Sequence, residues 1–227
     1  FDVELRVAGQ PPVRNVISLP IGHDVVSTLL DDDFESDRGW TYPTPSATDG
    51  SWQRVDPVGT VGAFGFVAQP ENDVGPDPEV TCQVTKNGLP GGAAGAADVD
   101  GGSVFLRSPR VGDANSRSMS MFWHGWFYSS NTAADDSYEM ALSVDGGSQW
   151  RSVLRVADDQ ARVGGWTEIM SNLSNLIGTD SAANLAVRVE VRDGPLDAGV
   201  VEGALDDVLI RSVREECRSF SPATRQP

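Results

Sequence analysis

The chain has 227 residues, of which 39% are apolar and 22% charged, and its formal net charge is −16. This length suits one large domain with or without a short extra segment, and the apolar content is enough for a hydrophobic core. The 33 acidic residues outnumber 17 basic ones and would repel phosphate backbones and anionic lipid headgroups, and no apolar run approaches the roughly 18 residues that span a bilayer. The composition therefore argues against nucleic acid and membrane insertion, and favours cations as partners.

Cys82 and Cys217 are the only cysteines, which excludes a CxxC metal or redox motif. Two free thiols and one disulfide both remain open. Cys217 lies in a polar stretch where an exposed thiol is a liability, so in an oxidising compartment a bridge to Cys82 is one alternative. Because the chain begins at Phe1 and not at a methionine, we expect a processed product or an excised piece.

The N-terminal segment, residues 1–30, begins with an apolar/polar alternation over residues 1–7 that predicts a half-buried strand. Further short extended stretches follow before the acidic run Asp31-Asp32-Asp33, where the composition changes. We expect a boundary near residue 30, with residues 1–30 forming the end of an upstream domain or a strand donated to a neighbouring subunit.

Residues 31–210 are predicted to form an all-β, antiparallel jelly-roll β-sandwich with long loops. Between residues 41 and 102 prolines are too closely spaced for helices, which indicates long loops on a sheet scaffold. Regular strand patterns begin at residue 103 and recur to residue 210, with Asp145-Gly146-Gly147 as a hairpin-type turn. Residues 211–227 are polar and are expected to form an exposed tail.

Several landmarks occur together in this order over residues 31–210. They are Asp33-Phe34-Glu35 with Gly39-Trp40, Gln69-Pro70-Glu71-Asn72-Asp73, Cys82-Gln83-Val84-Thr85-Lys86-Asn87, Asp98-Val99-Asp100-Gly101-Gly102, Leu106-Arg107-Ser108-Pro109, Met121-Phe122-Trp123, Ser143 to Trp150, Gly165-Trp166 and Val201 to Val208. In this the chain resembles a calcium-binding jelly-roll accessory module of secreted bacterial proteins, often C-terminal to peptidases. That module belongs with the concanavalin A-like sandwiches, which include MAM domains and many carbohydrate-binding modules.

The resemblance implies a secreted, non-catalytic fold with structural Ca²⁺, in which a glutamate of the first strand and an aspartate of the last share an ion. The matching positions are Glu35 with Asp206 or Asp207. A buried carboxylate without a cation is costly, and a shared ion would compensate for it. The alternative is that both aspartates face water at a sheet edge.

Asp98 and Asp100 are a second candidate pair for Ca²⁺, because carboxylates followed by two glycines suit a tight turn around a hard cation. An EF-hand is excluded, since Pro109 stands where its bidentate glutamate would be. The alternative is that both aspartates only cap turns.

Six tryptophans are present, and sugars stack on exposed indole faces. We predict Trp52, Trp126 and Tyr128 as ligand-binding residues, although core packing is the commoner role of such side chains. No HExxH, GxSxG, P-loop or GxGxxG motif is present.

The sequence therefore favours a non-catalytic extracellular module that binds a polysaccharide or cell-surface ligand and is stabilised by calcium. The first alternative is a structural subunit of a filament or surface assembly that polymerises by N-terminal strand addition to copies of itself. A polysaccharide-active enzyme on the same fold is the last alternative, because it would need a cluster of acids that no motif reveals.

Overall fold

The computed structural model of the chain describes residues 2–5, 8–9, 13–16, 21–62, 65–76, 78–130, 135–157, 164–196 and 199–218. Its strands are β1 (Asp2–Leu5), β2 (Val13–Val16), β3 (Ile21–Asp32), β4 (Gln53–Val55), β5 (Thr60–Val61), β6 (Val67–Gln69), β7 (Cys82–Val84), β8 (Gly102–Arg107), β9 (Ser118–Ser129), β10 (Ser137–Ser143), β11 (Arg151–Ala157), β12 (Thr167–Asn172), β13 (Ala186–Asp193) and β14 (Val201–Arg218). The helices of these residues are a 3₁₀ helix, η2 (Ala94–Ala96), and a one-turn helix, α1 (Ser174–Ile177). Neither of them is long or apolar enough to cross a membrane.

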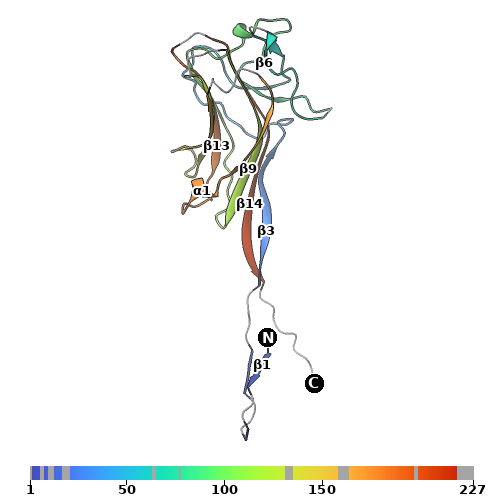
Figure 1. The fold of residues 1–227 in the computed structure, drawn as a ribbon, viewed down its shortest axis with the longest axis vertical. Helices are drawn as coiled ribbons and strands as arrows, with labels where there is room; N and C mark the ends of the chain where they lie inside the picture. The colour runs from blue at the N-terminus through green and yellow to red at the C-terminus, as the bar shows by residue number, and fades with distance from the viewer. Residues whose placement is uncertain are drawn as a thin grey trace.

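Two antiparallel sheets make up the body of the molecule (Figure 1). The four-stranded sheet has the order β11-β10-β13-β8, and the larger sheet has the order β12-β9-β14-β7-β4 with β3 added beside β14. The prediction of an all-β antiparallel sandwich is confirmed. The predicted strand patterns from residue 103 onward correspond to β8 through β14.

The core lies between the two sheets and is filled by apolar side chains that alternate with polar ones along the strands. On β13, Val187, Val189 and Val191 are fully buried, while Arg188 and Glu190 between them are partly exposed. From the larger sheet, Trp123 enters the same core. Successive strand residues point to opposite faces, so the sequence alternation places one apolar row inward from every strand.

A layer of loops covers part of the outer face of the larger sheet. The indole nitrogen of Trp126 donates to the carbonyl oxygen of Ala68 at 2.7 Å, and Tyr128 packs against Ala68 and Ala94. The segment predicted to consist of long loops therefore folds back over the sheet, and it contributes short strands such as β6 to this layer.

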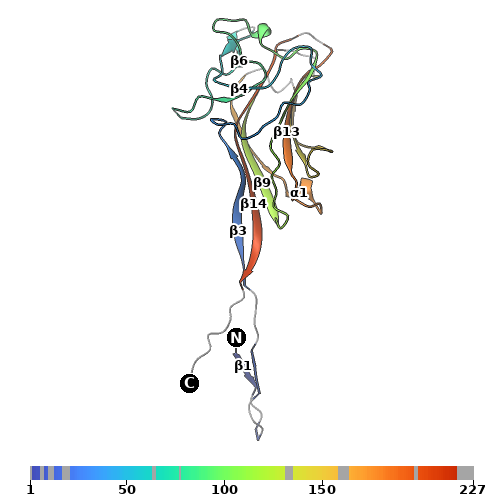
Figure 2. The ribbon, with the colours of Figure 1, turned by 180° about the vertical axis from the view of Figure 1, so that it is seen from behind.

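β3 and β14 form a long antiparallel ladder that extends beyond the two sheets (Figures 1 and 2). It runs from Val208 opposite Asp32 to Arg218 opposite Ile21. The expected divisions at residues 30 and 210 both fall within this ladder, so the ends assigned to a separate segment and to a tail pair with each other in the same chain. β1 pairs with β2, also within the chain.

Asp32 organises the turn by which the chain leaves β3. Its carboxylate is buried and accepts hydrogen bonds from the backbone nitrogen of Phe34 at 3.0 Å and from Nε1 of Trp40 at 2.7 Å. Phe34 has a φ of 58°, a left-handed conformation that is uncommon for a non-glycine residue. The carboxylate thus fixes both the strained turn and the buried indole.

Asp32→Ala is expected to lower the free energy of unfolding by about 2–4 kcal/mol, because it leaves a buried indole N–H and a backbone N–H without partners. Urea unfolding measures this loss. Asp37→Ala is the matched control, since Asp37 also accepts a backbone bond two residues ahead, from Gly39 at 2.8 Å, but in an exposed loop. Equal losses in the two variants would contradict the role given to Asp32.

Candidate functional site

A bulge in β14 brings two consecutive carboxylates to one face of the larger sheet. Asp206 lies opposite His124 of β9, and pairing resumes only at Leu209 opposite Phe122. Asp207 has a φ of 51° at this bulge, and its Oδ2 lies 3.1 Å from Nδ1 of His124, although not with hydrogen-bond geometry. In a regular strand neighbouring side chains point to opposite faces, so the bulge is what places both aspartates together.

Asp206 is almost completely buried, and both of its oxygens accept backbone hydrogen bonds. Oδ2 accepts from Val74 N at 2.9 Å and Oδ1 from Asp207 N at 2.9 Å. Burial raises the pKa of Asp206 to about 8, and the charge of Asp207 adds to this, while the bond from Val74 opposes it. Burial therefore disfavours the ionised form of Asp206 relative to its protonated form.

Glu35, Asp73 and Glu79 join these two aspartates, and we call the five residues the acidic cluster. Oε1 of Glu35 accepts from Thr81 N at 2.6 Å, from Thr81 Oγ1 at 2.9 Å and from Val80 N at 2.9 Å. Burial opposes the ionisation of Glu35, but the bonds from Thr81 and Val80 outweigh it and lower its pKa. Glu35 is thus held as an anion.

The pKa of Asp73 is raised by burial and then by the charge of Glu35, and the pKa of Glu79 is raised by desolvation and by the surrounding carboxylates, Asp207 among them. These mutual effects show that the members of the acidic cluster are electrostatic neighbours. In the described part of the chain, no group of three or more acidic, histidine or cysteine side chains is arranged so that it could hold a metal ion. The oxygens are nonetheless the hard donors that calcium prefers.

Asp98 and Asp100 lie just after η2, and the two side chains differ in burial. Asp98 is buried, and its pKa is raised to about 6 by burial and then by the charge of Asp100, whereas Asp100 is exposed. Sequence reasoning missed a third carboxylate here, Glu202 of β14. Burial and then the charge of Asp98 raise the pKa of Glu202 well above its usual value.

Only one oxygen of Glu202 has a hydrogen bond, accepted from Oγ1 of Thr60 at 3.4 Å. Its Oε2 is buried without a partner among the described residues. The sequence signal for Glu202 was an acidic residue in the apolar strand 200–210, the same signal that drew attention to Asp206. A buried carboxylate oxygen without a donor is costly unless it is protonated or binds a cation.

A pocket of about 370 Å³ opens beside the edge strand β4, and we call it the Tyr42 pocket. Its lining includes Arg38, Trp40, Tyr42, Gln53, Arg54 and Gln83. Tyr42 is 48% exposed, and its hydroxyl donates to Oε1 of Gln83 at 3.3 Å, while Nη1 of Arg54 donates to the carbonyl oxygen of Phe34 at 3.0 Å. The pocket thus combines an exposed ring with planar polar side chains held in fixed orientations.

The aromatic residues predicted to bind a ligand are buried. Trp52 is 3% exposed, Trp126 7% and Tyr128 2%. The prediction that they offer open rings is wrong, because the loop layer covers Trp126 and Tyr128, and Trp52 packs in the core. Trp52 still borders the Tyr42 pocket, and its buried Nε1 has no hydrogen-bond partner among the described residues. Sequence reasoning missed Tyr42, whose signal was an aromatic residue between Trp40 and Pro43 in a loop.

Of the two alternatives left open for the cysteines, the bridge between Cys82 and Cys217 does not form, because Cys82 is a buried free cysteine. Burial raises the pKa of the Cys82 thiol well above its ordinary range. Cys82 lies on β7, close to the part of β14 near Asp206, whereas Cys217 lies eleven residues further along β14. At about 3.3 Å per strand residue, this separates them by roughly 36 Å, far beyond the span of a disulfide.

No family model matches the chain, and no curated protein sequence matches it. Solved structures similar to it include the K3 cleaved adhesin domain of Lys-gingipain from Porphyromonas gingivalis W83, at 16% identity over 82% of this chain and 99% of that one, with a TM-score of 0.43. The CBM22-1 xylan-binding domain from Paenibacillus barcinonensis is 14% identical over 83% of this chain and 96% of its own, with a TM-score of 0.46. A carbohydrate-binding module specific for non-crystalline cellulose, CBM28, is 11% identical over 84% and 94%, with a TM-score of 0.45. These three similar structures are thus one adhesin domain and two carbohydrate-binding modules.

Proposed function

We propose that this chain is a non-catalytic extracellular module that binds carbohydrate or other cell-surface material. The observation that carries the proposal is the Tyr42 pocket. An exposed aromatic ring gives a sugar a stacking surface, and the amide and guanidinium groups of Gln53, Gln83 and Arg54 give its hydroxyls hydrogen-bond partners.

The lining of the pocket supports binding without cleavage. Glycoside hydrolysis generally needs two carboxyl groups on either side of the scissile bond. Among the residues that line the pocket, Asp37 is the one carboxylate, and it lies in the lining with two arginines, Arg38 and Arg54. This set of side chains can hold a sugar but lacks the paired acid and base of a glycosidase.

Structural calcium completes the proposal. The charges of Glu35 and Asp207 raise the pKa of Asp73, and we propose that a bound ion would draw these carboxylates together and relieve that repulsion. Asp206, whose oxygens already accept backbone bonds, would position Val74 and Asp207 around the ion. Asp98, with its neighbours Asp100 and Glu202, is the second location, supported by the unpartnered Glu202 Oε2.

Tyr42→Ala is expected to weaken binding to the neutral polysaccharide that the chain recognises by about tenfold, since an aromatic contact of this kind contributes roughly 1–2 kcal/mol. Affinity electrophoresis through gels that contain xylan or hydroxyethylcellulose measures the change. Phe66→Ala is the matched control, because Phe66 is 41% exposed and is not part of the pocket lining. The assignment of the pocket would be refuted if both variants weakened binding to the polysaccharide equally. It would also be refuted if Tyr42→Ala bound as tightly as the native chain to a polysaccharide that the native chain binds.

A further inference from the structure

The outward face of the four-stranded sheet carries an unusual concentration of arginine. Arg107 of β8 and Arg188 of β13 lie directly opposite each other in the antiparallel register. Two like charges in such a pair repel and destabilise a sheet. Two guanidinium groups at this position therefore need other interactions that offset their repulsion.

The charge of this face is opposite to that of the chain. Its outward ionisable residues are four arginines, Arg107, Arg155, Arg188 and Arg192, and two glutamates, Glu139 and Glu190. The face is thus net positive, whereas the whole chain has a net charge of −16. Beyond a Debye length of about 8 Å at physiological ionic strength, the distant acidic residues are largely screened, so an incoming ligand responds to the local positive charge.

Trp150 holds the two guanidinium groups in place. The Cζ atom of Arg188 lies 4.8 Å from the centroid of the Trp150 ring, and that of Arg107 lies 5.7 Å from it. The Cζ atom of Arg188 also lies 5.1 Å from the centroid of the Phe105 ring. Stacking on aromatic faces fixes the plane of a guanidinium group and leaves its N–H edges directed away from the ring.

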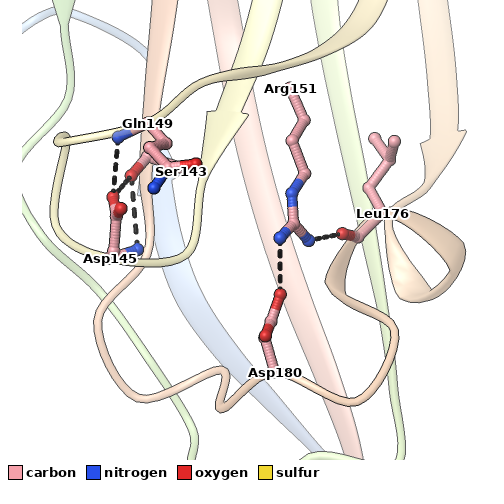
Figure 3. A network of polar contacts seen from close by, with 6 residues as sticks. All are labelled: Ser143, Asp145, Gln149, Arg151, Leu176 and Asp180. Carbon is pink, nitrogen blue, oxygen red and sulfur yellow. Dashed lines mark hydrogen bonds and ion pairs between the residues drawn. The ribbon is translucent and has the colours of Figure 1, made fainter.

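Hydrogen bonds to the residues before and after Trp150 fix the position of Trp150. Figure 3 shows these bonds for its neighbours Gln149 and Arg151. Oδ1 of Asp145 accepts from Gln149 N at 3.0 Å and from Ser143 Oγ at 2.7 Å. After the turn, Arg151 donates to Oδ2 of Asp180 at 2.6 Å and to the carbonyl oxygen of Leu176. The residues before and after Trp150 are therefore both anchored, so the ring is a rigid support.

The two arginines retain unused hydrogen-bonding capacity. Arg188 has one ion pair, from Nη2 to Oε2 of Glu190 at 3.4 Å, and its side chain is 24% exposed. Its Nε has no hydrogen-bond partner among the described residues but is buried, so an incoming anion would meet the terminal nitrogens of the guanidinium group. Arg107 donates from Nη2 to the carbonyl oxygen of Gly146. A guanidinium group has five N–H donors in a planar fork that matches a carboxylate or sulfate.

We propose that Arg107 and Arg188, supported by Trp150, form a site for an anionic group, carboxylate or sulfate, on an acidic polysaccharide. The proposal rests on the proposed function in one respect, namely that the ligand is a polysaccharide. The pair binds the anion through charge-assisted, bidentate hydrogen bonds, and the anion removes the repulsion between the two arginines. None of Arg107, Arg188 and Trp150 lines the Tyr42 pocket. The two sites are nevertheless neighbours, because the backbone of Thr41, next to Tyr42, pairs with that of Arg107.

The test uses affinity electrophoresis of the chain through gels that contain polygalacturonate, heparin or neutral hydroxyethylcellulose. The double variant Arg107→Gln with Arg188→Gln is expected to bind the acidic polymer at least about tenfold more weakly, since each charge-assisted hydrogen bond is worth more than a neutral one. Retention by polygalacturonate identifies a carboxylate ligand, and retention by heparin alone identifies a sulfate ligand. Binding to the neutral polymer, which reports on the Tyr42 pocket, should stay within about twofold of the unchanged chain.

The matched control is Arg117→Gln with Arg214→Gln, which removes the same charge from exposed arginines paired with Glu215 and Glu216. Equal weakening by the two double variants would show a net-charge effect and overturn the site, as would unchanged binding in the Arg107 and Arg188 variant. Retention by the neutral polymer alone overturns this inference but not the proposed function, whereas no retention by any polymer defeats both. Light scattering covers one more outcome: a dimer that dissociates only in the Arg107 and Arg188 variant would assign the face to a second copy of the chain and overturn the proposal.

Discussion

Calcium at 10 mM is expected to raise the midpoint of thermal unfolding of this chain by about 5 °C or more over its value in chelator. A ligand that binds only the folded state at one hundred times its dissociation constant stabilises by about 2.7 kcal/mol, and a domain of this size gains roughly 2–4 °C per kcal/mol. The physical reason is the acidic cluster, where the ion would replace repulsion between Glu35, Asp73 and Asp207 with attraction. Differential scanning fluorimetry measures the shift.

Asp207→Asn is expected to abolish most of that calcium-dependent shift, because it removes a ligand charge from the cluster without removing bulk. The control is Asp24→Asn, which removes the same charge from an exposed position on β3. If Asp24→Asn and Asp207→Asn reduce the shift equally, the ion is held by the overall charge and not by the cluster. An unchanged midpoint in calcium and in chelator for the native chain would refute the calcium proposal outright.

In chelator, the chain is expected to be less stable at pH 8.5 than at pH 5.5, which is the reverse of ordinary acid denaturation. The pKa of Asp206 is raised to about 8 by burial, so the folded state binds a proton that the unfolded state releases near pH 4. The stabilisation is complete below the unfolded pKa and is lost as the pH rises through about 8. Between pH 5.5 and about 8 the unfolded carboxyl is already ionised, so roughly two and a half units of the shift are lost in this window, an upper bound of roughly 3 kcal/mol.

Other buried carboxylates act in the same direction, since burial raises the pKa of Asp98 to about 6 and that of Glu202 well above its usual value. The lowered pKa of Glu35 acts in the opposite direction, but only below about pH 4.5, outside this window. Urea unfolding at the two pH values measures the difference, and Asp206→Asn should reduce it. Equal or greater stability at pH 8.5 in the native chain would contradict the burial of these charges.

The strands from residue 103 onward could be predicted from the sequence because each combines a period-two pattern with a clear turn. On β13, alternating valine with Arg188 and Glu190 is sufficient to define both faces of the strand. The ladder between β3 and β14 could not be predicted in this way, because its partners are nearly two hundred residues apart and pairing of this kind leaves no local signal. The alternation near the N-terminus indicated strands but not which strand each would meet.

The sequence singled out Glu35, Asp206 and Asp207 as a shared calcium site, which stays a prediction. A regular strand would separate the two aspartates onto opposite faces, so the arrangement of Asp206 and Asp207 depends on the backbone at Asp207. The positive φ of Asp207 and the accompanying bulge have no signature in the residue types. The aromatic candidates failed for a related reason, since the loop that covers Trp126 through its bond to Ala68 comes from a distant segment.

Whether the chain binds a polysaccharide without cleaving it can be measured in a single experiment. The chain is mixed with each polysaccharide that retards it in an affinity gel, and both retardation and the release of reducing ends are followed over time. We expect retardation by at least one polysaccharide, weakened by Tyr42→Ala, with no reducing ends above the level of polymer alone. Release of reducing ends in proportion to the concentration of chain, or retardation by none of the polysaccharides, would contradict it.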